Sequence, residues 1–111
     1  MLTTRKKLLL LDALLESYPD EVITGYLVDA RVSCNTVVGR AYKSLGYGEG
    51  ELLRSGEIRE VIQYQHRWLI RARGHDCLVI VNFAPGGRQA LMHLIDLYQT
   101  AKLAQSSRLL Q

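Results

Sequence analysis

Three short stretches of strand-forming residues follow one another within residues 58–83, and they carry the clearest pattern of the chain. The last of them, residues 77–83, is apolar at positions that would face both sides of a sheet. A strand that is apolar on both faces needs a packed layer over each face. Helical segments near the two ends of the chain are the obvious layers, so the pattern predicts a sheet with helices packed on it.

The middle stretch has the alternation of a half-buried strand, with Trp68, Ile70 and Ala72 on one face. The positions between them place arginines on the other face, although Leu69 interrupts the set. Turns are expected at residues 65–66 and 74–75. The side of this strand that carries the arginines is the best candidate for contact with an acidic protein surface. The expected partner-binding residues are Arg67, Arg71 and Arg73.

Leucines at helical spacing predict a helix from a cap at Thr3 or Thr4 to about Tyr18. The main apolar stripe of this helix is Leu8, Leu11, Leu15 and Tyr18. Further leucines at positions 9, 10 and 14 widen the apolar face beyond the need of a single surface helix. The helix is therefore expected either to lie between two layers or to meet another subunit. A second amphipathic helix is predicted over residues 88–105, followed by a frayed tail, residues 106–111.

Residues 21–47 are expected to form a hairpin and then a helix. Strand formers occupy residues 21–30, a tight turn is expected at residues 29–30, and a short second strand at residues 31–34. Asn35 or Thr36 can cap a helix, and residues 51–54 can add one more helical turn. The apolar positions of the expected helix are Val37, Val38, Ala41, Tyr42 and Leu45. The predicted fold is a single α/β (α+β) domain over residues 1–111, with a central antiparallel sheet of about five strands in the order α-β-β-α-β-β-β-α.

Composition narrows the class of protein without naming a function. A chain of 111 residues with 48% hydrophobic and 23% charged residues is typical of one globular domain. The net charge of +3 is spread along the sequence, so an acidic partner is compatible and nucleic acid is not required. No apolar run approaches the ~20 residues that span a bilayer. Two cysteines are too few for a disulfide scaffold, which favours reduced thiols and a cytoplasmic location.

Candidate chemistry is sparse. The glycines at positions 46, 48 and 50 follow an expected helix rather than a strand, and no Gly-Lys-Ser/Thr accompanies them, so we interpret them as a helix terminator. The histidines at positions 66, 75 and 93 lack metal-ligand spacing, and no nucleophile is placed beside a base. We therefore expect no metal, no cofactor and no enzymatic activity.

The predicted order of elements resembles the Roadblock / dynein light-chain family over nearly the whole chain. The stretches that carry the resemblance are residues 26–29, 56–61, 76–81 and 88–94. The resemblance implies a non-enzymatic homodimer that acts as a scaffold or as a regulator of Ras-like small GTPases. It also implies pairing through the middle helix and the first strand of the meander. The corresponding positions are Val37, Val38, Ala41, Tyr42, Val61, Ile62 and Tyr64.

A helix-turn-helix DNA-binding regulator is the alternative interpretation, and it uses residues 24–47. On this hypothesis residues 24–31 form the first helix and residues 40–47 belong to the recognition helix. The side chains facing DNA would be Asn35, Arg40 and Lys43. The alternative requires residues 21–34 to be largely helical, whereas the Roadblock-like interpretation requires them to be extended.

Overall fold

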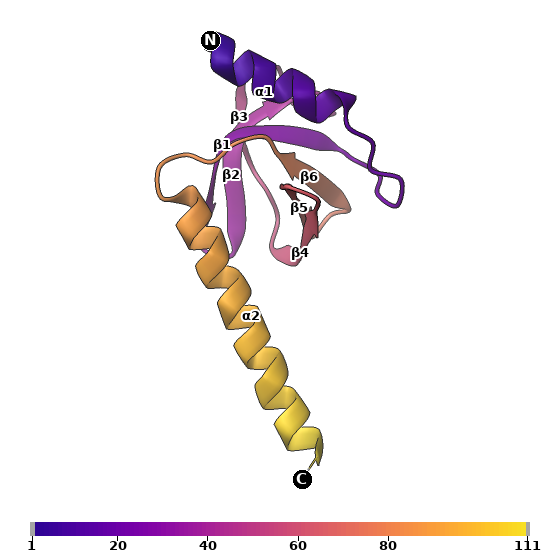
Figure 1. Cartoon of the computed structure of the whole chain (residues 1–111), viewed down its shortest axis with the longest axis vertical. Helices are drawn as coiled ribbons and strands as arrows, with labels where there is room; N and C mark the ends of the chain where they lie inside the picture. Colours follow the sequence, from indigo (N-terminus) through magenta and orange to yellow (C-terminus); the bar gives the residue numbers. More distant parts are fainter. Residues whose placement is uncertain (1, 111) are drawn as a thin grey trace.

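The computed structural model of the chain describes residues 2–110, and for residues 102–110 it describes the backbone alone. Two helices flank six strands (Figure 1). The helices are α1 (Thr4–Leu15) and α2 (Gly87–Leu110). The strands are β1 (Gly25–Ser33), β2 (Thr36–Tyr42), β3 (Glu51–Arg54), β4 (Ile58–Tyr64), β5 (Arg67–Ala72) and β6 (Asp76–Ile80).

The six strands form one mixed sheet in the order β3-β2-β1-β6-β5-β4. Each half is an antiparallel meander, and the parallel pair β1–β6 joins the two halves. The sequence predicted the open sheet with helices, but the strand number, the purely antiparallel pairing and the order of elements were wrong. The meander of β4, β5 and β6, with turns at residues 65–66 and 73–75, is as expected.

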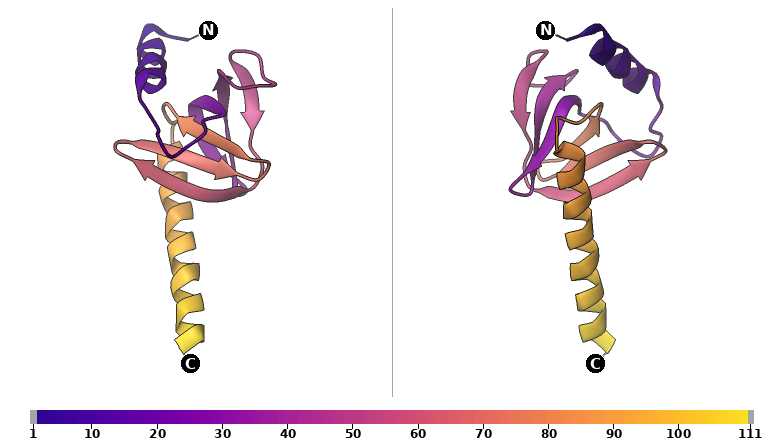
Figure 2. Two further views of the ribbon diagram at one scale, coloured as in Figure 1. Left: turned by 90° about the vertical axis from the view of Figure 1, so that its right-hand side faces the viewer. Right: turned by 60° about the vertical axis from the view of Figure 1, so that its left-hand side comes forward.

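The sheet is strongly curled, as the two views in Figure 2 show. β3 and β4 are the opposite edges of the sheet, yet only residues 55–57 separate them in sequence. Six flat strands would hold their edges about 24 Å apart, whereas such a link reaches roughly 14 Å. Two backbone hydrogen bonds fix the link beside β2: Ser55 N donates to Val37 O (2.9 Å) and Ile58 N donates to Asn35 O (2.8 Å).

The two faces of the sheet have separate cores. Leu78 and Ile80 of β6 pack with Leu91 of α2 on one face. Cys77, Val79 and Val81 pack on the other face with α1. The prediction that helices from both ends of the chain cover a strand that is apolar on both sides is therefore confirmed. At the end of the sheet nearest the β1–β2 turn, the Tyr98 hydroxyl of α2 lies 2.6 Å from Asn35 Oδ1 and 3.2 Å from Ile58 O.

The predicted middle helix is wrong, because residues 36–42 are β2 and residues 51–54 are β3. Cys34 and Asn35 both have positive φ (50° and 58°), as in the two-residue turns that join antiparallel strands. β-branched residues at positions 36–38 suit the strand that follows. Side chains then alternate, with Val37 and Ala41 facing the α2-side core and Tyr42 packing on the α1-side core.

The expected turn at residues 29–30 is instead a bulge within one long strand. Asp29 has φ 54°, and the pairing of β1 with β2 shifts register between Val28 and Arg31. A bulge inserts an extra residue and bends the strand without ending it. The predicted short strand at residues 31–34 is therefore largely the second half of β1.

The helix-turn-helix alternative is also wrong, because residues 25–33 and 36–42 are paired strands. Neither the first helix nor the recognition helix of that motif exists in this segment. Both end helices are confirmed with shifted bounds. α1 is capped by Thr3, as expected, but ends at Leu15 rather than near Tyr18. α2 reaches Leu110, past the predicted end at residue 105, and Gln111 lies outside the described residues. Within residues 2–110, no helix has the length and hydropathy to cross a membrane.

Candidate interaction surfaces

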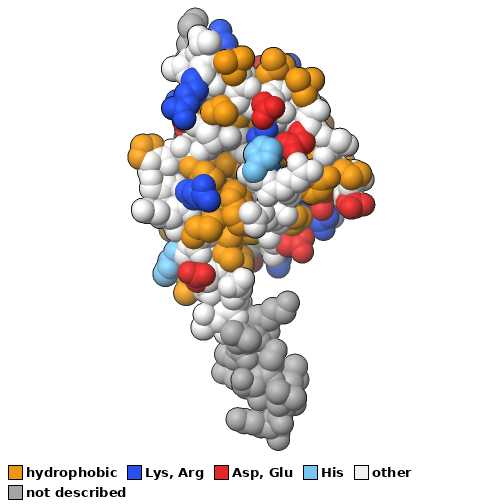
Figure 3. Space-filling model, viewed as in Figure 1, with side chains coloured by type: hydrophobic (Ala, Val, Ile, Leu, Met, Phe, Trp, Pro, Cys, Tyr) orange, Lys and Arg blue, Asp and Glu red, His pale blue; other side chains and the backbone are white. Residues whose placement is uncertain are grey.

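α1 is apolar on two opposite faces. Leu10 and Ala13 are buried against the sheet. Leu8, Leu11 and Leu15, which follow helical spacing on the far side, are 62%, 52% and 78% exposed. The predicted main stripe is therefore largely the outward face, and sequence reasoning assigned the burial to the wrong leucines. We call these three residues the leucine ridge, and Figure 3 shows hydrophobic side chains gathered along α1 at the top of the molecule.

The residues of the expected dimer interface do not form one surface. Val37, Val38 and Ala41 are buried within the chain itself, with at most 3% of each exposed. They cannot meet a second subunit without unfolding the sheet. Tyr42 is half-buried against the α1-side core. The three remaining residues, Val61, Ile62 and Tyr64, lie half-buried on β4, which is an edge strand.

Arg67 was expected to contact a partner, but it is 5% exposed and lies under α1. Its Nε donates to Glu16, and its Nη2 lies 2.6 Å from Asp12 Oδ2. Burial acts to lower the pKa of Arg67, but the hydrogen bond to Glu16 and the nearby negative charges outweigh it and raise the pKa. Arg67 therefore holds α1 on the sheet and is not available to a partner in this structure.

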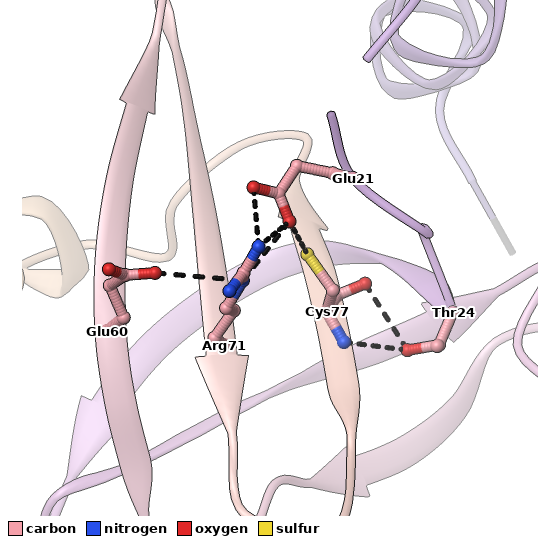
Figure 4. Close-up of polar contacts among 5 residues, drawn as sticks. All are labelled: Glu21, Thr24, Glu60, Arg71 and Cys77. Atoms are coloured by element: carbon pink, nitrogen blue, oxygen red, sulfur yellow. Dashed lines mark hydrogen bonds and ion pairs between the residues drawn. The ribbon is translucent and has the colours of Figure 1, made fainter. Parts of the chain in front are cut away.

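Arg71 is half exposed, and its charge is already paired (Figure 4). Its Nη2 donates to both carboxylate oxygens of Glu21, at 2.8 Å and 2.6 Å. Glu60 Oε1 lies 3.6 Å from its Nε. Of the expected basic set, Arg73 alone is exposed without an ion pair among the described residues. The positive charge expected at Arg67, Arg71 and Arg73 is thus largely neutralised by acidic side chains of the same chain.

Cys77 lies beside this ion pair. Its thiol donates to Glu21 Oε2 at 3.7 Å, and its backbone N–H donates to Thr24 Oγ1 at 3.0 Å. Burial, followed by the negative charge of Glu21, raises the pKa of Cys77 to about 11. The thiol therefore stays protonated near neutral pH, and a protonated thiol is a poor nucleophile.

The sequence matches no family model, and neither a curated protein nor a solved structure matches it. Among residues 2–101, whose side chains the structure describes, no three His, Cys, Asp or Glu side chains are grouped so that they could hold a metal ion. Three features of the described residues are candidates for interaction: the leucine ridge, the open edge of β4 and the exposed cationic side chains.

Proposed function

We propose that this chain is a non-enzymatic, homodimeric adaptor of the cytoplasm that binds a further protein. The observation that carries the proposal is the leucine ridge, because its three leucines are each more than half exposed on a helix whose other face is already packed. Contiguous apolar patches on soluble proteins commonly mark interaction sites. A partner that presents an apolar groove would cover this helix by the helix-in-groove mode.

The state of the polar side chains supports binding over catalysis. Arg67 is engaged by Glu16 and Asp12, and Arg71 is engaged by Glu21, so these groups connect elements of the fold. The Cys77 thiol is held protonated. Both cysteines are free, which supports a reducing compartment such as the cytoplasm.

The open edge of β4 supports self-association. β5 pairs with one side of β4, and within residues 2–110 no strand pairs with the other side. An edge strand displays unpaired backbone groups that a second copy can satisfy by antiparallel pairing about a two-fold axis. Such pairing would also cover Val61, Ile62 and Tyr64, which are the accessible part of the expected dimer interface.

Replacing Val61 and Tyr64 with glutamate is expected to convert a dimer into a monomer. The added carboxylates would lie along both edges of the paired strands, and like charges on neighbouring strands repel. Molar mass from light scattering after size-exclusion chromatography is the measurement, with circular dichroism to verify the fold. The matched control is Val22→Glu with Leu45→Glu, which adds the same charge at exposed positions outside β4. A wild-type monomer, or a folded variant that stays dimeric, would count against self-pairing through β4.

The sequence stretches that resemble Roadblock proteins, although the order of elements differs, make a Ras-like small GTPase the first partner to test. Replacing Leu11 and Leu15 with glutamate is expected to weaken binding at least about tenfold, because charges would replace the apolar contact. Capture of purified GTPases, loaded with GDP or with a non-hydrolysable GTP analogue, is the measurement. The Val22→Glu, Leu45→Glu chain is again the control. Equal capture by the ridge variant would refute the role of the ridge, and no capture by the wild type would refute the choice of a GTPase.

A further inference from the structure

Three arginines that are distant in sequence gather on the outer face of β1, β2 and β3. Arg40 is paired with Leu52 across β2 and β3, while Val38 is paired with Arg54 on one side and Arg31 on the other. Directly paired residues of neighbouring strands project to the same face. This face is opposite to the core that α2 covers, since Val37, Ala41 and Leu53 point into that core. We call the exposed residues of this set the arginine face: Arg31, Arg40, Leu52 and Arg54.

Among the side chains that the structure describes, no carboxylate forms an ion pair with the arginines of the arginine face. In contrast to Arg67 and Arg71, neither Arg31 nor Arg40 forms an ion pair with any side chain of residues 2–101. Arg54 Nη1 donates to the neutral Thr36 Oγ1 at 2.9 Å. The carboxylate beside this face is Asp29, and Lys6 Nζ holds it at 2.8 Å.

Asp29 leaves the positive charge of the face intact. The hydrogen bond from Lys6 holds the pKa of Asp29 below its usual value, and the charge of Arg40 adds to this effect. Asp29 and Lys6 therefore cancel one another near neutral pH, and three guanidinium groups remain. Clustered charges of one sign attract an oppositely charged partner from a distance.

The arginine face is also hollowed. Arg31, Arg40 and Asp29 line a depression of about 230 Å³, together with Val38, Gly39, Leu52 and Ala84. Leu52 is 53% exposed there. The surface thus combines a depression of side-chain size, lined by both apolar and charged residues, with guanidinium groups that match carboxylates.

We propose that the arginine face binds an acidic segment of the partner protein, with one apolar side chain of that segment seated in the hollow. This inference rests on the proposed adaptor function and names the chemistry of the segment that is recognised. Two features favour an acidic peptide over a nucleic acid. The exposed Leu52 lies among the arginines where a phosphodiester chain would need further polar contacts. Guanidinium groups, in turn, pair with carboxylates in a bidentate manner.

The test measures binding of a fluorescent peptide that is rich in Asp and Glu and has one central Leu. A length of about ten residues is enough to cover such a surface. Its Leu-to-Ser analogue is the second probe. The double change Arg31→Glu and Arg40→Glu is expected to weaken binding of the leucine peptide at least about tenfold, because attraction becomes repulsion. The matched control is Arg59→Glu with Arg73→Glu, which alters net charge equally at exposed positions outside the face. Leu52→Ser is expected to weaken the leucine peptide and to leave the serine peptide unchanged.

If the Arg31→Glu, Arg40→Glu chain and the Arg59→Glu, Arg73→Glu chain lost the same affinity for the peptide, the proposal would be overturned. The loss would then depend on net charge and not on the arginine face. The proposal would also be overturned if single-stranded DNA or anionic lipid vesicles bound more tightly than the peptide and this binding were lost with Arg31→Glu and Arg40→Glu. The arginine face would then be a site for that other ligand. The Leu11→Glu, Leu15→Glu chain is expected to bind the peptide as the wild type does. Failure of the arginine face is thus distinguishable from failure of the leucine ridge, because each has its own variant and its own ligand.

Discussion

Replacing Arg67 with alanine is expected to lower the free energy of unfolding by about 3 kcal/mol, because it leaves a buried carboxylate without its partner. Arg67 is almost wholly buried, and Glu16 is mostly buried beside it. The loss should be read from urea denaturation followed by circular dichroism. Since Arg67 connects β5 to α1, amides of α1 should also exchange hydrogen faster than those of β6.

Arg71→Ala is the matched control, since Arg71 lies on the same strand face and also forms an ion pair, but is half exposed. Exposed ion pairs contribute little, so this change should alter stability far less than Arg67→Ala. A double-mutant cycle with Glu16→Gln separates the pair from the packing of the Arg67 side chain. If Arg67→Ala and Arg71→Ala had similar small effects, the structural role assigned to Arg67 would be wrong.

Replacing Gly87 with valine is expected to destabilise the fold by about 3 kcal/mol through overpacking. A Cβ at this position would overlap the carbonyl oxygen of Ala30 in the bulge of β1. Gly87 is buried where α2 begins, so the backbone of the helix must move away from the sheet to make room. Because the helix carries Leu91 and Tyr98, the α2-side core should loosen with it. Thermal and urea unfolding are the measurements.

The neighbouring Gly86 provides the control for this prediction. Its φ is 78°, but no atom lies within 4 Å of the position that a Cβ would take. Gly86→Ala should therefore cost only the conformational strain of a left-handed residue, about 1 kcal/mol. Equal effects at the two glycines would contradict close packing of α2 on the bulge.

Two sets of arginines show that the fold, and not the sequence pattern, decides which positive charges form ion pairs. Arg67 and Arg71 are conspicuous in sequence because they alternate with apolar residues, yet carboxylates of the same chain pair with both. Arg31, Arg40 and Arg54 form no pattern in sequence, but pairing of the strands brings them onto one face. The first set is paired within the chain, and the second set is the one that we propose binds a partner.

The local patterns of the sequence determined the helices at both ends, the meander of β4, β5 and β6, and the need to cover β6 on both faces. These features depend on periodicity within a few residues, which the backbone geometry of helices and strands imposes directly. Tertiary structure decided that residues 36–42 are a strand, because pairing with β1 and β3 outweighs helical spacing of the same apolar residues. It also decided which leucines of α1 are buried and which arginines are neutralised. The Arg67–Glu16 contact spans 51 positions, so no local pattern could report it.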